Sequence, residues 1–73
     1  MPDIADRLKE LRKSRGITQK QVFTAIGLGE KNYQCFEYGT YRPSHDSIIK
    51  LADFFEVSTD YLLGLTDNPE RLR

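Results

Sequence analysis

The sequence contains few of the residues on which covalent and metal chemistry depends. It has one cysteine, Cys35, and one histidine, His45. A single cysteine cannot close an internal disulfide, and one cysteine with one histidine cannot assemble a zinc site or a histidine-based triad within one chain. We therefore expect no metal, no cofactor and no enzymatic activity. We interpret Cys35 as an ordinary small residue rather than a redox switch, and His45 as a solvated residue in the first turn of a helix.

Long apolar runs are also absent. No stretch approaches the roughly 20 apolar residues that a membrane helix needs. The N-terminus becomes polar and acidic within its first few residues, unlike a signal peptide. We therefore expect a cytoplasmic protein without a membrane partner. The length of 73 residues predicts one domain. Such a chain buries only about 60% of its unfolded surface, which favours a surface-binding module over an enzyme with a buried cavity.

The formal net charge is zero, which argues against a bulk polyanion binder, but the charge is unevenly distributed. Residues 1–20 carry a net charge of +3 and residues 43–64 carry −3. This polarity favours a charged partner that binds in one orientation. The alternative is that the solvated faces of separate helices happen to differ in charge.

Residues 17–39 are the most informative part of the chain, because they predict two short helices joined by a glycine turn. Thr18 is a good N-cap, and Gln21 three residues later completes a capping-box pattern. Gly27 permits the positive φ that often ends a helix, and a second helix is expected over residues 30–38. A helix, a tight turn and a helix is the organisation that places a second helix in the DNA major groove.

Hydrophobic periodicity and capping residues predict three further helices, over residues 3–14, 44–55 and 58–64. We find no strand pattern and no internal repeat. The sequence therefore predicts an all-α, compact five-helix fold, with a domain over residues 1–64 and a tail or linker start over residues 65–73.

The first helix has a clear apolar stripe. Ile4, Leu8 and Leu11 recur at intervals of three and four residues. Basic residues are expected to fill the outer face of this helix: Arg7, Lys9, Arg12 and Lys13.

Several short motifs follow one another in order between residues 4 and 64. They are Leu8-Lys9-Glu10-Leu11-Arg12, Gly16-Ile17-Thr18-Gln19, Phe36-Glu37-Tyr38-Gly39, Arg42-Pro43-Ser44 and Val57-Ser58-Thr59-Asp60-Tyr61-Leu62-Leu63-Gly64. Each is weak alone, but together they resemble the Cro/repressor-type (XRE-like) helix-turn-helix family of phage and bacterial transcriptional regulators. The resemblance implies a lambda-repressor-like DNA-binding domain whose third helix enters the major groove.

The resemblance also implies which residues contact DNA. The positions expected to read bases are Glu30, Lys31, Asn32, Gln34 and Cys35. The positions expected to contact the DNA backbone are Thr18, Gln19, Lys20, Tyr41 and Arg42. In such proteins the glutamine that opens the second helix anchors a phosphate, together with the amides at the N-terminus of that helix.

The chemistry of three of these side chains agrees with base reading. Lys31 can donate to guanine O6 and N7, and Asn32 can pair with adenine N6 and N7. Glu30 has two interpretations, because it can accept from cytosine N4 or simply complement the positive end of its helix. We favour the second, because an acid that faces phosphates is costly.

Three residues raise structural questions. Glu37, in the last turn of its helix, needs a cationic partner, which either Arg12 or Arg15 can supply. Phe23 stands where the family usually has alanine, so its ring must swing outward or push the next helix away. Glu56 stands where glycine is common, so the end of the fourth helix is expected to differ.

The resemblance further implies a homodimer on an inverted-repeat operator. The candidates for one exposed apolar patch at its interface are Phe54, Tyr61 and Leu65. Alternatively, Phe54 only covers the edge of the core.

The leading interpretation is a sequence-specific regulator that binds double-stranded DNA, most simply a repressor. The alternative is a protein-interaction module that retains the fold, similar to an anti-repressor or antitoxin. In a third interpretation the chain is the N-terminal half of a longer regulator.

Overall fold

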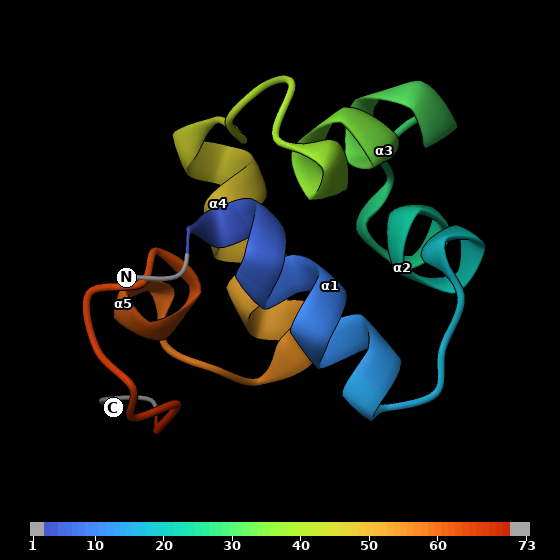
Figure 1. Ribbon diagram of the computed structural model, residues 1–73. Coiled ribbons are helices and arrows are strands. Elements are labelled where there is room, and N and C mark those ends of the chain that lie inside the picture. The colour runs from blue at the N-terminus through green and yellow to red at the C-terminus, as the bar shows by residue number, and fades with distance from the viewer. Residues whose placement is uncertain (1–2, 71–73) are drawn as a thin grey trace.

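The computed structural model describes residues 3–70, which form five α-helices (Figure 1). The helices are α1 (Ile4–Ser14), α2 (Gln19–Ile26), α3 (Glu30–Tyr38), α4 (His45–Phe55) and α5 (Thr59–Leu62). No strand occurs among the described residues, so the prediction of an all-α five-helix fold is confirmed. Residues 1–2 of the expected domain and residues 71–73 of the expected tail lie outside the described residues.

Side-chain caps explain where most of these helices begin. In four of them the capping oxygen accepts from the backbone amide three residues later, which satisfies a donor that the helix leaves free. The capping residues are Asp3, Thr18, Ser44 and Ser58, as the sequence predicts. Gly29, which precedes α3, has no side chain to offer.

Left-handed residues end three of the helices. Gly27 after α2 has φ 75°, as the sequence predicts, and Gly39 after α3 has φ 79°. Glu56 ends α4 with φ 56° and ψ 43°, the conformation that glycine adopts most easily. The end of α4 therefore keeps the glycine-type geometry with a glutamate in place, and the expected change in shape does not occur.

One hydrophobic core receives side chains from all five helices. Its fully buried members are Leu8, Val22, Tyr33, Leu51, Phe55 and Leu62. The helices α2 and α3 lie together on one side of the molecule, while α5 lies on the opposite side (Figure 1). The core therefore joins the helix-turn-helix unit to the C-terminal helices.

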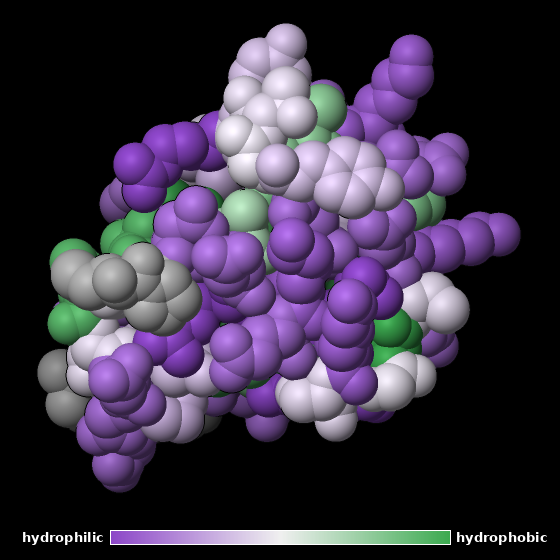
Figure 2. All heavy atoms as spheres, in the orientation of Figure 1, coloured by the Kyte–Doolittle hydropathy of each residue, from purple (hydrophilic) through white to green (hydrophobic). Residues whose placement is uncertain are grey.

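The surface around this core is mainly hydrophilic on the face shown in Figure 2. No helix within residues 3–70 has both the length and the apolar character needed to cross a membrane.

The expectation that the basic residues of α1 all face outward is wrong for Arg12, whose side chain is only 16% exposed, and for Arg7. Arg7 is only 6% exposed, and its guanidinium carbon lies 4.0 Å from the centre of the Tyr61 ring. Its Nη2 donates to Asp67 Oδ1 at 2.8 Å and to the Thr66 carbonyl at 3.4 Å. The guanidinium of Arg7 is therefore occupied by contacts with the C-terminal segment and is not free to contact a phosphate.

The described part of the expected tail folds back onto the helices. The amide of Leu65 donates to the Asp60 carbonyl at 2.9 Å, and the amide of Ser58 donates to the Pro69 carbonyl at 3.0 Å. Together with the contacts of Arg7, these bonds hold residues 65–69 against α1 and α5.

Candidate nucleic-acid interface

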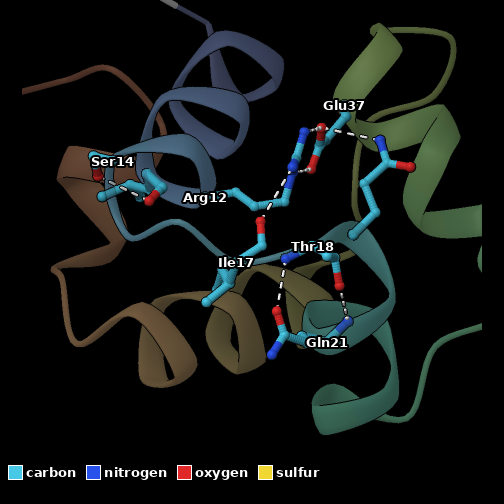
Figure 3. Close-up of polar contacts among 8 residues, drawn as sticks. Arg12, Ser14, Ile17, Thr18, Gln21 and Glu37 are labelled. Carbon is cyan, nitrogen blue, oxygen red and sulfur yellow. Dashed lines mark hydrogen bonds and ion pairs between the residues drawn. The ribbon is translucent and has the colours of Figure 1, made fainter.

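The N-terminus of α2 has the predicted capping box (Figure 3). The Thr18 amide donates to Gln21 Oε1 at 2.8 Å, and the Gln21 amide donates to Thr18 Oγ1 at 3.1 Å. The amides of Gln19 and Lys20 have no acceptor within the helix, because they belong to its first turn. α2 also has no acidic residue in its first turn, unlike the other four helices. Its positive end is therefore left for an outside anion.

The turn between α2 and α3 is short and tightly bonded. The Leu28 amide donates to the Phe23 carbonyl at 2.9 Å, across the left-handed Gly27. Gly29 then opens α3 in an extended conformation. This turn fixes the direction in which α3 leaves α2.

A buried ion pair anchors α3 to α1 (Figure 3). Arg12 Nε donates to Glu37 Oε2 at 2.7 Å, and Arg12 Nη2 donates to Glu37 Oε1 at 3.1 Å. Arg12 Nη1 also donates to the Ile17 carbonyl at 3.2 Å. The expected partner of Glu37 is therefore Arg12. Arg15 instead donates to the Phe55 carbonyl.

The environment of Glu37 keeps it ionised although it is only 1% exposed. Burial alone would raise its pKa, but hydrogen bonds from Arg12 and Gln19 outweigh that effect and lower the pKa below its usual value. The hydroxyl of Tyr33 faces the same carboxylate and also lowers its pKa, without reaching hydrogen-bond geometry. The hydrogen bond to Glu37 raises the pKa of Arg12 in turn. The Arg12–Glu37 ion pair therefore stays charged and connects α1 to α3 of the helix-turn-helix unit.

Gln19 belongs to this network. Its Nε2 donates to Glu37 Oε1 at 3.2 Å, so its side chain is already oriented by α3. Sequence reasoning missed this bond, because it joins residues that lie far apart along the chain. The amide group has a second N–H, which can still donate to a phosphate.

The predicted base-reading residues of α3 fall into two groups. Glu30, Lys31 and Asn32 are exposed in its first turn, whereas Gln34 and Cys35 are half-buried. Gln34 Nε2 lies 3.5 Å from Glu30 Oε1, the limit of a hydrogen bond. The structure therefore presents the first three residues most freely, and their base-reading role stays a prediction.

The expected backbone contacts are exposed at Thr18, Lys20, Tyr41 and Arg42, and half-buried at Gln19. Tyr38, at the end of α3, is 67% exposed and was not predicted as a site residue. The signal was present in the sequence, because the inward pair Tyr33 and Phe36 places Tyr38 on the opposite face.

Electrostatics distinguish this part of the surface. Between residues 18 and 42 the exposed charged side chains are Lys20, Lys31, Arg42 and Glu30, because Glu37 is buried against Arg12. Between residues 43 and 64 the exposed charges are Lys50 and four acids, Asp46, Asp53, Glu56 and Asp60. The helix-turn-helix unit is therefore the basic side of a molecule whose C-terminal helices are acidic.

The three residues predicted for a dimer interface differ in how exposed they are. Leu65 is 64% exposed. Phe54 is half-buried, with its ring 5.0 Å from that of Phe55 at 83°, and Tyr61 is half-buried with Arg7 over its ring. Phe54 thus packs against the edge of the core, and its place in a dimer interface stays a prediction. Ile49 of α4, 42% exposed, is an apolar surface residue that sequence reasoning missed.

Within the described residues, no group of three or more His, Cys, Asp or Glu side chains is arranged to hold a metal ion.

A helix-turn-helix family model matches residues 8–62 of the chain. The chain is 39% identical over 64 residues to the HTH-type transcriptional regulator YobD of Bacillus subtilis, covering 88% of this chain and 57% of that protein. It is 39% identical over 61 residues to the regulator ImmR of the same organism, covering 84% of this chain and 48% of that protein. It is 35% identical over 71 residues to the phage CTXphi repressor RstR of Vibrio cholerae, covering 94% and 63%. The chain thus spans about half the length of the curated relatives that it matches.

Two solved structures share the fold. A transcriptional regulator from Listeria innocua superposes with a TM-score of 0.79 at 26% identity, covering 85% of this chain and 58% of that chain. The P22 c2 repressor, solved with a synthetic operator, superposes with a TM-score of 0.80 at 22% identity, covering 86% and 96%. The five-helix arrangement is therefore that of repressor-type helix-turn-helix domains.

Proposed function

Because the chain belongs to the helix-turn-helix family, as its sequence resemblance indicated, we propose that it is a sequence-specific DNA-binding transcriptional regulator, most simply a repressor. α3 enters the major groove, and the N-terminus of α2 lies against a phosphate of the same half-site. The observation that carries this proposal is the exposed first turn of α3, with Lys31 and Asn32, beside the acid-free N-terminus of α2.

The chemistry of that surface supports base reading. Lys31 offers a cation for guanine O6 and N7, and Asn32 offers an amide for adenine N6 and N7. Lys20 and Arg42 add charge for the DNA backbone on either side of α3. With only three exposed basic residues between residues 18 and 42, non-specific binding should be weak.

Weak binding by one domain favours a homodimer on an inverted repeat. Two recognition helices about 34 Å apart on one DNA face double the contacts and fix the spacing of the half-sites. The acidic α4 and α5 helices are unsuited to DNA, which leaves them and Leu65 for the contact between protomers. In this proposal the protein is a non-enzymatic binding module that acts in the cytoplasm.

The decisive experiment is selection of bound sequences from a random duplex pool at moderate salt, with equilibrium sedimentation of the free protein. We expect enrichment of an inverted repeat with half-sites about one helical turn apart. Only salt-sensitive background binding, without enrichment, would contradict the proposal. It would favour the interaction-module alternative, for which the acidic α4–α5 region is the natural surface.

Point variants then separate reading from anchoring. Asn32→Ala should lose about 1–3 kcal/mol of discrimination at one base pair. Lys20→Ala should weaken all sequences alike and lower the salt slope by about 1. Binding to base-pair variants of the selected duplex measures both effects. Lys20 is a cleaner phosphate probe than Gln19, because Gln19 also holds Glu37. A uniform loss in both variants would show that α3 is not the reader.

A further inference from the structure

Phe23 occupies an unusual place between α2 and α3. It is half-buried, with one side packed against the core. α3 still reaches that core, since Tyr33 is fully buried and Phe36 is 9% exposed. Phe23 therefore lies at the edge of the core with part of its ring exposed, and α3 still packs on that core.

The exposed side of Phe23 lines an open cleft. The same cleft is lined by Thr18, Gln19 and Lys20 at the start of α2 and by Glu30 at the start of α3. Its remaining lining residues, Arg12, Gly16 and Ile17, come from the end of α1 and the loop that follows it. Figure 3 shows the beginning of α2 at Thr18, close to the Arg12–Glu37 pair that holds α3. The cleft thus borders both the helix end proposed to face a phosphate and the first residue of the helix proposed to read bases.

With α3 in the major groove and the N-terminus of α2 against a phosphate, as proposed above, this position would face the outer edge of the major groove, where the bases meet the sugar-phosphate backbone. The C5 substituent of a pyrimidine projects into the major groove near that edge, and for thymine it is a methyl group. A phenyl ring has no hydrogen bond to offer a phosphate or an amino group. A methyl group is the part of the DNA that this ring can bind favourably.

We propose that Phe23 is a specificity-determining residue that contacts the C5 methyl group of a thymine at the outer edge of each half-site. The proposal rests on the function proposed above. Phe23 adds a preference for thymine that the polar side chains of α3 do not supply.

The test compares thymine with deoxyuridine, which differs only by the methyl group. The probe is the duplex enriched by selection, with thymines replaced one at a time by deoxyuridine in one half-site. We expect one replacement to weaken binding of the natural chain roughly fourfold, the value of one buried methyl group. Phe23→Ala should bind the two duplexes equally, and Phe23→Leu should keep part of the difference.

The ratio of the two affinities makes the test robust to loss of stability, because partial unfolding reduces binding to both duplexes by the same factor. Phe54→Ala is the matched control, since Phe54 is also a half-buried phenylalanine but lies on α4. It should keep the full thymine preference even if overall binding falls.

Two results would overturn the proposal: no thymine whose methyl group matters to the natural chain, or a full preference that persists in Phe23→Ala. Either result leaves the proposed DNA-binding function intact, because the enriched duplex is still bound. Failure to enrich any duplex would instead overturn the proposed function and this inference together.

Discussion

Two arginines on α1 form long-range ion pairs in contrasting surroundings. Arg12 meets Glu37 in a pair whose side chains are 16% and 1% exposed. Arg7 meets Asp67 in a pair whose side chains are 7% and 97% exposed. The difference teaches that the burial of the partner decides what an ion pair is worth. A buried carboxylate without its cation is costly, whereas an exposed carboxylate is solvated with or without one.

The two arginines also hold different parts of the structure against α1. Arg12 bonds to the Ile17 carbonyl and to Glu37 of α3, and so fixes the position of the helix-turn-helix unit against α1. Arg7 ties α1 to Thr66 and Asp67, and so sets the path of the chain beyond α5. Loss of Arg12 should therefore disturb DNA binding, whereas loss of the Asp67 contact should not.

The largest effect is expected from Arg12→Ala. It leaves Glu37 buried without a cation, which costs about 3–5 kcal/mol and approaches the whole stability of a small domain. Urea denaturation followed by circular dichroism measures the loss. Lys13→Ala is the control, because Lys13 is exposed on the same helix and should change stability by less than about 0.5 kcal/mol. A loss below about 1 kcal/mol for Arg12→Ala would show that Glu37 finds another donor.

The sequence predicted one of these arginines and not the other, for a physical reason. Glu37 in the last turn of a helix demands a cation, so a partner at the end of the first helix was predictable. Arg7 stands three residues after Ile4 and four before Leu11, on the same apolar stripe as Leu8. Periodicity therefore pointed inward, but its charge suggested a solvated position. The Tyr61 ring that covers it comes from the far end of the chain, and local patterns do not reveal such contacts.

The helix ends were predictable because their signals are local. The caps at Thr18, Ser44 and Ser58 each involve only the next three residues. The path of residues 65–70 was not predictable from the sequence, because it depends on contacts between residues far apart in the chain. The Ser58 amide donates to the Pro69 carbonyl, and Arg7 pairs with Asp67. The candidate site shows the same difference between local and long-range signals. Local patterns located the first turn of α3, but they did not reveal the hydrogen bond between Gln19 and Glu37, which are 18 residues apart.

Acid should remove the stabilisation that the Arg12–Glu37 ion pair provides. The pKa of Glu37 is lowered in the folded protein, so its contribution to stability is present above the unfolded pKa of about 4.3. That contribution is lost as the pH falls through the lower folded pKa. A difference of one between the two pKa values corresponds to about 1.4 kcal/mol. Urea denaturation from pH 7 to pH 3 should therefore show a steep decline below about pH 4.

Glu37→Gln is the matched variant for this measurement. It should be less stable at pH 7, because Arg12 loses its buried anion, but its stability should depend less on pH in the acid range. Parallel curves for the natural chain and Glu37→Gln would show that other carboxylates dominate acid unfolding.

The smallest effect is expected from Asp67→Asn. Arg7 itself is buried, but the amide oxygen of asparagine can still accept from it, and the Thr66 carbonyl and the Tyr61 ring remain beside it. The change should therefore cost about 0–1 kcal/mol, and binding to the selected duplex should not change. Arg7→Met must cost more than Asp67→Asn, because Arg7 also packs on the Tyr61 ring and bonds to the Thr66 carbonyl. Urea denaturation of both variants gives the order. If Asp67→Asn instead cost as much as Arg12→Ala, exposure of the carboxylate would not be what separates the two pairs, and the C-terminal segment would be as integral to the fold as α3.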